Sequence, residues 1–101
     1  MYNEVIKLIA VEEDTNEVGD LVKVKTEREV FTEVKSIGQS EFYQAQAVGL
    51  KPEIKFVLAD YYDYGDEKLI NYNGKDYKVI RTYRNNYEIE LVCVGDANAN
   101  T

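Results

Sequence analysis

The 101-residue sequence is long enough for one domain whose core needs no disulfide, and it leaves no room for a second domain. Nineteen acidic and twelve basic residues give a formal net charge of −7, which would repel duplex phosphates and argues against nucleic-acid binding over a broad surface. Histidine is absent, which excludes Ser-His-Asp and Cys-His catalysis as well as histidine metal sites.

The first third of the chain predicts strands. Residues 5–11 are rich in β-branched side chains and are apolar on both faces, so we expect a strand that is covered on both sides. Residues 22–25 and 28–37 alternate between apolar and polar side chains and predict one or two further strands. These strands can form a long edge ribbon.

An acidic segment, residues 12–20, separates these strands. It carries five acids and no base, and both its turn-forming residues and the mutual repulsion of its carboxylates favour an exposed loop. The acids of this loop are Glu12, Glu13, Asp14, Glu17 and Asp20.

A short helix is predicted over residues 41–48. Ser40 can cap its first turn, Gly49 stands where it should stop, and Pro52 follows shortly after. About two helical turns are too few for stability in water, so we expect packing to hold the helix in place. The residues that share the expected packing face are Phe42, Ala45 and Gly49.

The second half of the chain predicts a meander. Residues 54–58 alternate as a strand. Residues 68–72 and 75–83 form a hairpin around Asn73-Gly74, because this dipeptide supplies the two positive φ angles of a type I′ turn.

A turn at residues 84–86 leads into the last strand, and residues 95–101 have nothing to bury and are expected to be a flexible tail. The side chains expected to point inward from the last strand are Tyr87, Ile89, Leu91 and Cys93, while Glu88 and Glu90 are expected to face water.

About six antiparallel strands in so short a chain would leave exposed edges unless the sheet curled. The sequence therefore predicts a mainly β fold over residues 1–94, a small antiparallel β-barrel or rolled sandwich of about six strands. One short helix lies in an excursion in the middle of the chain.

No catalytic, metal or cofactor site is expected. Cys93 is the only cysteine, so no internal disulfide can form, and its place on an alternating strand favours burial. The acids between Leu58 and Leu69 do not follow the spacing of an EF-hand calcium loop, and no cleft for an acid pair can be inferred. These acids are Asp60, Asp63, Asp66 and Glu67.

Tyr61, Tyr62 and Tyr64 could form an aromatic platform for a sugar or for single-stranded bases, but the neighbouring carboxylates would repel a nucleic-acid backbone. Contact with a protein neighbour is the favoured interpretation. The N-terminal MYNEVIK lacks the pattern of a signal peptide, and no stretch approaches the ~20 apolar residues of a membrane span. We therefore expect a soluble protein that is made and kept in a cytoplasm.

Three segments carry a family resemblance: TEREVFTEVKSIGQSEFYQAQAVGLKPEIKFVL, INYNGKDYKVIRTY and YEIELVC. They contain, in order, a strand ending in Glu-Val-Lys, a short helix with a Lys-Pro-Glu turn, and a meander around a Gly-Lys-x-Tyr pattern. Together they resemble the phage head-tail joining family, the head closure or stopper proteins of long-tailed phages or prophages of Gram-positive bacteria. The resemblance covers residues 1–94.

The resemblance implies a structural protein of the virion neck rather than an enzyme. Such a protein is a small β-barrel that assembles in the host cytoplasm as a ring, expected to be dodecameric, although the isolated protein can be a monomer. The ring binds below the portal and its adaptor after DNA packaging, closes the channel and presents a docking surface for a tail completion or tail terminator protein. DNA is only passing cargo, and no membrane or cofactor is involved.

By the same resemblance, the excursion from residue 36 to residue 51 would project toward the ring axis or a neighbouring subunit. The residues that match the helix motif, and are expected to make channel or inter-subunit contacts, are Ser40, Glu41, Phe42, Tyr43 and Gln46. For Phe42, anchoring the helix on the barrel is the favoured role. The acidic loop is consistent with a conduit whose walls repel passing DNA.

Two alternatives stay open at this point. The first is a tail completion or terminator ring protein, which is also small and β-rich. The second is a monomeric β-barrel module that binds a ligand through Tyr61, Tyr62 and Tyr64.

Overall fold

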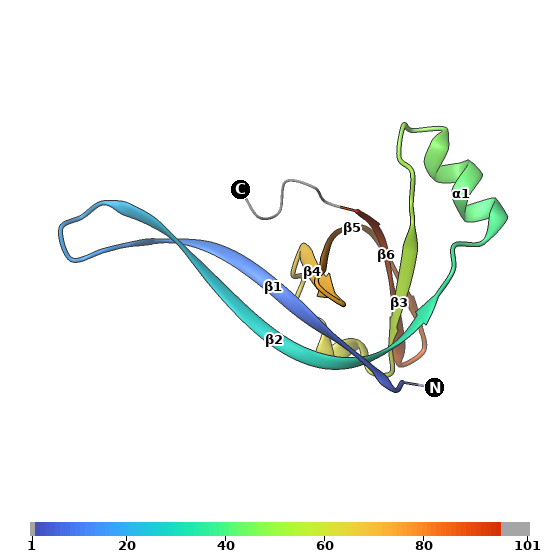
Figure 1. The fold of residues 1–101 in the computed structure, drawn as a ribbon, viewed down its shortest axis with the longest axis horizontal. Helices are drawn as coiled ribbons and strands as arrows, with labels where there is room; N and C mark the ends of the chain where they lie inside the picture. The colour runs from blue at the N-terminus through green and yellow to red at the C-terminus, as the bar shows by residue number, and fades with distance from the viewer. Residues whose placement is uncertain (1, 96–101) are drawn as a thin grey trace.

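Six antiparallel strands close into a barrel in the order β1-β2-β3-β6-β5-β4 (Figure 1). The structure is a computed structural model, and it describes residues 2–95. It confirms the mainly β fold with one short helix between the second and third strands. The elements are β1 Glu4–Thr15, β2 Leu21–Lys35, α1 Gln39–Gln46, β3 Ile54–Leu58, the 3-10 helix η1 Tyr61–Asp63, β4 Leu69–Tyr72, β5 Lys75–Asn85 and β6 Glu88–Gly95.

The core fills the barrel interior with alternate side chains of the strands, as the period of two predicts. Phe56 on β3 is fully buried and lies opposite Leu91 on β6. The rings of Tyr72 and Tyr77 pack edge-on against Phe56, with centroids 5.4 and 5.7 Å from that of Phe56. The remaining buried core residues are Ile6, Leu8, Leu58, Ile70, Val79, Ile89 and Cys93.

A two-stranded ribbon extends well beyond the barrel (Figure 1). β1 and β2 are paired from Glu4↔Thr32 to Thr15↔Leu21, but β4 pairs only with residues 7–9 of β1 and β3 only with residues 33–35 of β2. Every residue from 11 to 29 is exposed. We call residues 11–25 the ribbon. The pairing of β1 with β2 over this range confirms the long ribbon that the alternation predicted.

Two expectations from the sequence, on the cover of the first strand and on the acidic segment, need correction. On the outer face of β1, Ile9 is buried but Val5 and Val11 are exposed, so this face is covered only in part. Glu12, Glu13 and Asp14 lie in β1 rather than in a loop, because Val22 and Val24 opposite them extend the ladder. The turn itself is confined to residues 16–20, which include Glu17 and Asp20.

α1 begins two residues earlier than predicted. Gly38 occupies the N-cap position without a side-chain hydrogen bond, and Ser40 lies inside the first turn, so the predicted serine cap is wrong. Gly49 does follow the helix end with φ of +82°, and Leu50 N–H donates to the carbonyl of Ala45. No helix in the described part of the chain is long and apolar enough to cross a membrane.

The Asn73-Gly74 hairpin is confirmed, with φ of 51° and 77° at the two turn residues. β5 continues to Asn85, so the next turn lies later than predicted, and Tyr87 in that turn is 76% exposed instead of pointing inward. Gly95 pairs with Tyr77 as the last residue of β6, although the tail was predicted to begin there. The rest of the predicted tail, residues 96–101, lies outside the described residues.

Candidate interaction surfaces

Buried apolar side chains also lie on the outer faces of β3 and β6, and α1 reaches this side of the barrel through Glu41 and Ala45. On these strands Lys55 pairs with Val92, and Val57 pairs with Glu90, so these side chains face away from the barrel interior. Val57 and Val92 are nevertheless buried. Ala45 of α1 is also buried and lines the same groove as Val92. Packing therefore holds the helix, as its short length requires.

A charged cluster fastens α1 to the same outer face. The Nζ atom of Lys55 lies 2.8 Å from Oε1 of Glu41 on α1 and 2.9 Å from Oε1 of Glu90 on β6. Burial alone would lower the pKa of Lys55, but the hydrogen bonds to the two carboxylates outweigh it and raise that pKa. The other carboxylate oxygen of Glu41, Oε2, is buried without a hydrogen-bond partner.

The five residues of the predicted contact set do not form one site. Glu41 and Phe42 are partly buried, and Glu41 contacts its own barrel through Lys55. The ring of Tyr43 meets that of Phe42 edge-on, with centroids 6.2 Å apart, and is itself exposed. The members that stay exposed for contact with another molecule are Ser40, Tyr43 and Gln46.

A groove of about 440 Å³ runs between α1 and the outer face of β5 and β6. Its walls are largely apolar, and they are formed by Ala45, Val48, Leu50, Ile80 and Val92, with Gln44, Glu41, Arg81 and Tyr83 completing the lining. No pattern in the sequence indicates this groove, because its walls come from distant segments, and Ile80 in its lining is the extra residue of a register shift between Val79 and Arg81.

The three tyrosines expected to form a ligand platform do not share one exposed surface. Tyr61 and Tyr62 stack with centroids 4.2 Å apart, and the guanidinium of Arg84 covers Tyr61 at 3.5 Å. Tyr64 packs against the core, and its hydroxyl donates a hydrogen bond to the carbonyl of Glu67. Burial is the main cause that raises the pKa of Tyr64 to about 12, and the nearby carboxylates of Asp66 and Glu67 add to it. Only Tyr62 of the three is exposed, so the described residues form no joint aromatic platform here.

Two acids of the same loop, Asp60 and Glu67, form structural hydrogen bonds. Glu67 is buried, accepts from Arg28 at 2.7 Å and accepts from the backbone N–H of Gly65 at 2.7 Å. Burial alone would raise the pKa of Glu67, but the hydrogen bonds from Arg28 and the backbone lower it. Asp60 caps η1 by accepting from Tyr62 N–H, and within residues 2–95 no three acidic or sulfur ligands converge to hold a metal ion.

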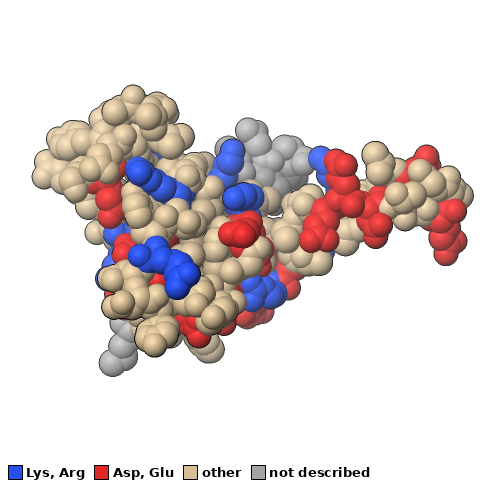
Figure 2. All heavy atoms as spheres, turned by 180° about the vertical axis from the view of Figure 1, so that it is seen from behind, with Lys and Arg blue, Asp and Glu red and all other residues tan. Residues whose placement is uncertain are grey.

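Charge is distributed unevenly over the molecule. The ribbon carries the five acids named in the sequence analysis against two lysines, Lys23 and Lys25. Figure 2 shows acidic side chains gathered along the projecting ribbon, and Lys and Arg side chains spread over the barrel among further acids. No family model and no curated protein matches this sequence.

Proposed function

We propose that this protein is a structural component of a bacteriophage neck, a head closure protein that assembles as a ring below the portal and its adaptor. In this role it closes the DNA channel after packaging and offers a docking surface to a tail completion or tail terminator protein. It acts in the virion neck, after assembly in the host cytoplasm, and its role is structural rather than enzymatic. The family resemblance of residues 1–94 suggests the role.

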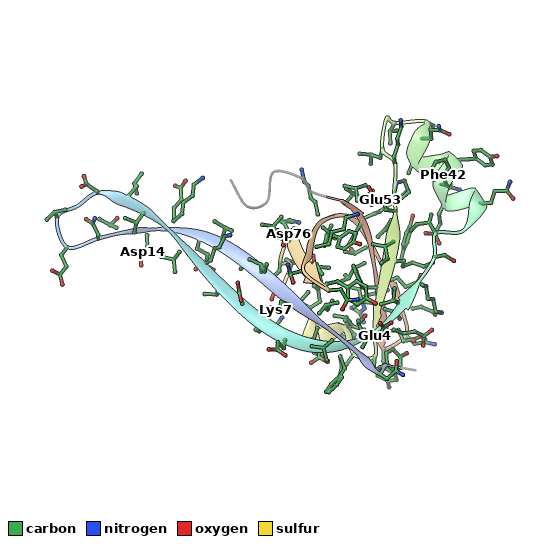
Figure 3. All side chains as sticks on the ribbon, viewed as in Figure 1. Glu4, Lys7, Asp14, Phe42, Glu53 and Asp76 are labelled. Atoms are coloured by element: carbon green, nitrogen blue, oxygen red, sulfur yellow. The ribbon has the colours of Figure 1, made fainter. Side chains whose placement is uncertain are left out.

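The observation that carries the proposal is the ribbon, which stands free of the barrel (Figures 1 and 3). A two-stranded ribbon on its own is marginally stable in water at best. Here it also exposes apolar side chains along its length, which are Val11, Val18, Leu21, Val22 and Val24. An exposed apolar extension of this kind is typical of a subunit that is completed by a neighbour in an assembly.

The helical excursion supports the same role from the other side of the barrel. Lys55 and Ala45 attach α1 to the barrel. The helix therefore has a fixed position, and its side chains Ser40, Tyr43 and Gln46 are exposed to solvent. We propose that these three residues make the channel or inter-subunit contacts. Glu41 and Phe42 position the helix instead.

The overall charge suits a DNA conduit. Each copy has a formal net charge of −7, and a ring multiplies this charge around the channel. Walls that repel phosphate let a duplex pass without adhering to them. Tight binding of DNA to the assembled ring, insensitive to salt, would contradict this part of the proposal.

The test is native mass spectrometry of the protein alone and mixed with purified portal and adaptor rings from the same genome. Stoichiometric addition to the portal-adaptor ring is expected. The informative variant replaces residues 11–25 with Asn-Gly, which joins the cross-strand partners Ala10 and Thr26 by a tight turn and leaves the barrel pairing intact. We expect this variant to keep its thermal unfolding transition and to lose addition to the ring.

A wild-type protein that stays monomeric in every mixture would contradict the head closure role. Binding to a tail tube end instead of the portal-adaptor ring would favour a tail completion or terminator protein. A monomer whose tyrosine fluorescence shifts with a small ligand would favour the binding module, although the packing of Tyr61 and Tyr64 against the core speaks against it.

A further inference from the structure

The ribbon and the groove lie at opposite ends of the molecule. Figure 3 shows Asp14 on the ribbon and Phe42 on α1 far apart, with the barrel between them. The longest dimension of the protein, 51 Å against 29 and 25 Å for the other two, follows from this arrangement. A ribbon that belongs to the same copy therefore cannot fill the groove, but the ribbon of a second copy can.

The two surfaces match in their apolar content. Val18 and Leu21 at the end of the ribbon are 79% and 74% exposed, so both side chains are free to be buried by a neighbour. Val48 on the groove wall is 74% exposed, beside the partly exposed Leu50. Burying such side chains against one another stabilises a contact by about 25 cal/mol for each Å² of apolar surface.

The two surfaces also match in charge. The ribbon has an excess of three acids, because its five carboxylates face only Lys23 and Lys25. At the groove, Arg81 forms part of the lining, Lys78 lies on the same outer face of β5, and Lys51 adjoins Leu50. Glu41 also lines the groove, and Lys55 contacts both Glu41 and Glu90, so these three side chains together leave one negative charge against the three cations. Arg81, which also lies over the ring of Tyr83, and the nearby Lys51 and Lys78 have no ion-pair partner among residues 2–95.

We propose that the ribbon of one copy docks in the groove between α1 and β5–β6 of the next copy. The contact joins two different surfaces, so each copy gives one ribbon and receives another, and such contacts produce rings when the rotation closes. The inference deepens the proposed function, on which it rests, by naming the contact between neighbouring subunits. It assigns the acids of the ribbon to a neighbour's cations rather than to the DNA channel.

The contact can be tested by cross-linking two differently tagged copies, one with Leu21→Cys and one with Val48→Cys, with a short bismaleimide. Both positions are exposed, so neither substitution should disturb folding. Cys93 is fully buried, and burial raises its pKa to about 12, so the native cysteine should not react. The matched control replaces Val48→Cys with Tyr62→Cys, which is equally exposed but lies away from the groove. The mixtures are examined both free and with portal and adaptor rings.

We expect the Leu21–Val48 pair to cross-link several times more than the Leu21–Tyr62 control pair, with a further increase on the portal-adaptor ring. Adding Arg81→Glu to the Val48→Cys copy should lower the yield at least about threefold, and so should salt near 1 M, where the Debye length is about 3 Å. Equal yields for the two pairs, with or without the rings, would overturn the ribbon contact.

The same samples separate the contact from the function. Stoichiometric binding to the portal-adaptor ring with cross-linking at the control level would reject the contact and keep the head closure role. Strong Leu21–Val48 cross-linking without any binding to those rings would keep the contact and reject the head closure role.

Discussion

Lys55 on β3 holds Glu41 on α1 through a contact of 2.8 Å, although both residues lie outside the barrel core. The same ammonium group contacts Glu90 at 2.9 Å, so one cation joins the helix, β3 and β6. The lysine side chain is 11% exposed and the two carboxylates about a quarter exposed. The excursion that carries α1 is thus attached to the barrel by one charged cluster and a small apolar contact around Ala45.

Lys55→Met is expected to loosen this attachment. It leaves two carboxylates without their shared cation, and because they are partly exposed the cost should fall below the 3–5 kcal/mol of a fully buried pair, at about 2 kcal/mol. Urea unfolding should show this loss, and amide exchange should accelerate over Gln39–Gln46 more than over β6. Since the pKa of Lys55 is raised, its contribution is present below the ordinary value of 10.5 and is lost as the pH rises through the higher folded value.

The control for this change is Lys51→Met, which removes the same charge at an exposed position. It should change the free energy of unfolding by less than about 0.5 kcal/mol. Equal effects of the two substitutions, or an exchange rate of α1 that does not respond to Lys55→Met, would show that the cluster does not hold the helix.

The Arg28–Glu67 pair at the base of the ribbon is expected to make stability depend on acid pH. The pKa of Glu67 is lowered from the ordinary 4.5, so the unfolded state binds its proton first as the pH falls. Its stabilisation is therefore present above pH 4.5 and is lost as the pH falls through the lower folded value. Glu67→Gln should lower the free energy of unfolding by about 1–2 kcal/mol at neutral pH. It should also weaken the dependence of that free energy on pH in the acid range.

Urea midpoints measured at a series of pH values down to about 3 test this expectation. Glu17→Gln is the matched control, because Glu17 lies in the exposed turn of the ribbon and the formal charge changes equally. If both variants kept the acid dependence of the wild type, Glu67 would not be its source.

The hairpin between β4 and β5 should depend on the glycine in its turn. Gly74 has φ of +77°, and a Cβ added there would meet no atom within 4 Å, so Gly74→Ala tests backbone conformation without a steric clash. We expect a loss of about 1–2 kcal/mol in urea unfolding. Gly38→Ala, at the N-cap of α1 with φ of −69° and similar space around it, should cost only about a few tenths of a kcal/mol, because alanine is a poorer N-cap than glycine but its backbone is not strained there. Equal effects would contradict the type I′ assignment.

The barrel was predictable because its determinants are local. Asn73-Gly74 fixes the hairpin, and the alternation around Phe56 and Leu91 identifies the inward face of β3 and β6. The same alternation predicted Tyr87 to point inward. That prediction was wrong because Asn86, with φ of 57°, starts the turn later than the asparagine-rich segment suggests.

The candidate surfaces were less predictable because they depend on contacts between distant segments. The acidic residues of 12–20 looked like a loop, but pairing with Val22 and Val24 extends the ladder through them. Nothing in the spacing of Glu41, Lys55 and Glu90 indicates that they meet. Ile80 in the groove lining is the extra residue of a bulge, and a bulge has no sequence signal of its own here.

The two phenylalanines that lie on opposite faces of the sheet provide a test of the barrel itself. Phe56 is fully buried between Tyr72 and Tyr77, so Phe56→Ala removes an aromatic ring from the centre of the core and leaves a cavity. We expect a loss of about 3–5 kcal/mol in urea unfolding. Phe31 is 67% exposed on the outer face of β2, so Phe31→Ala should cost less than about 0.5 kcal/mol. If Phe31→Ala were as damaging as Phe56→Ala in the monomer, the assignment of inner and outer faces along β2 and β3 would be wrong.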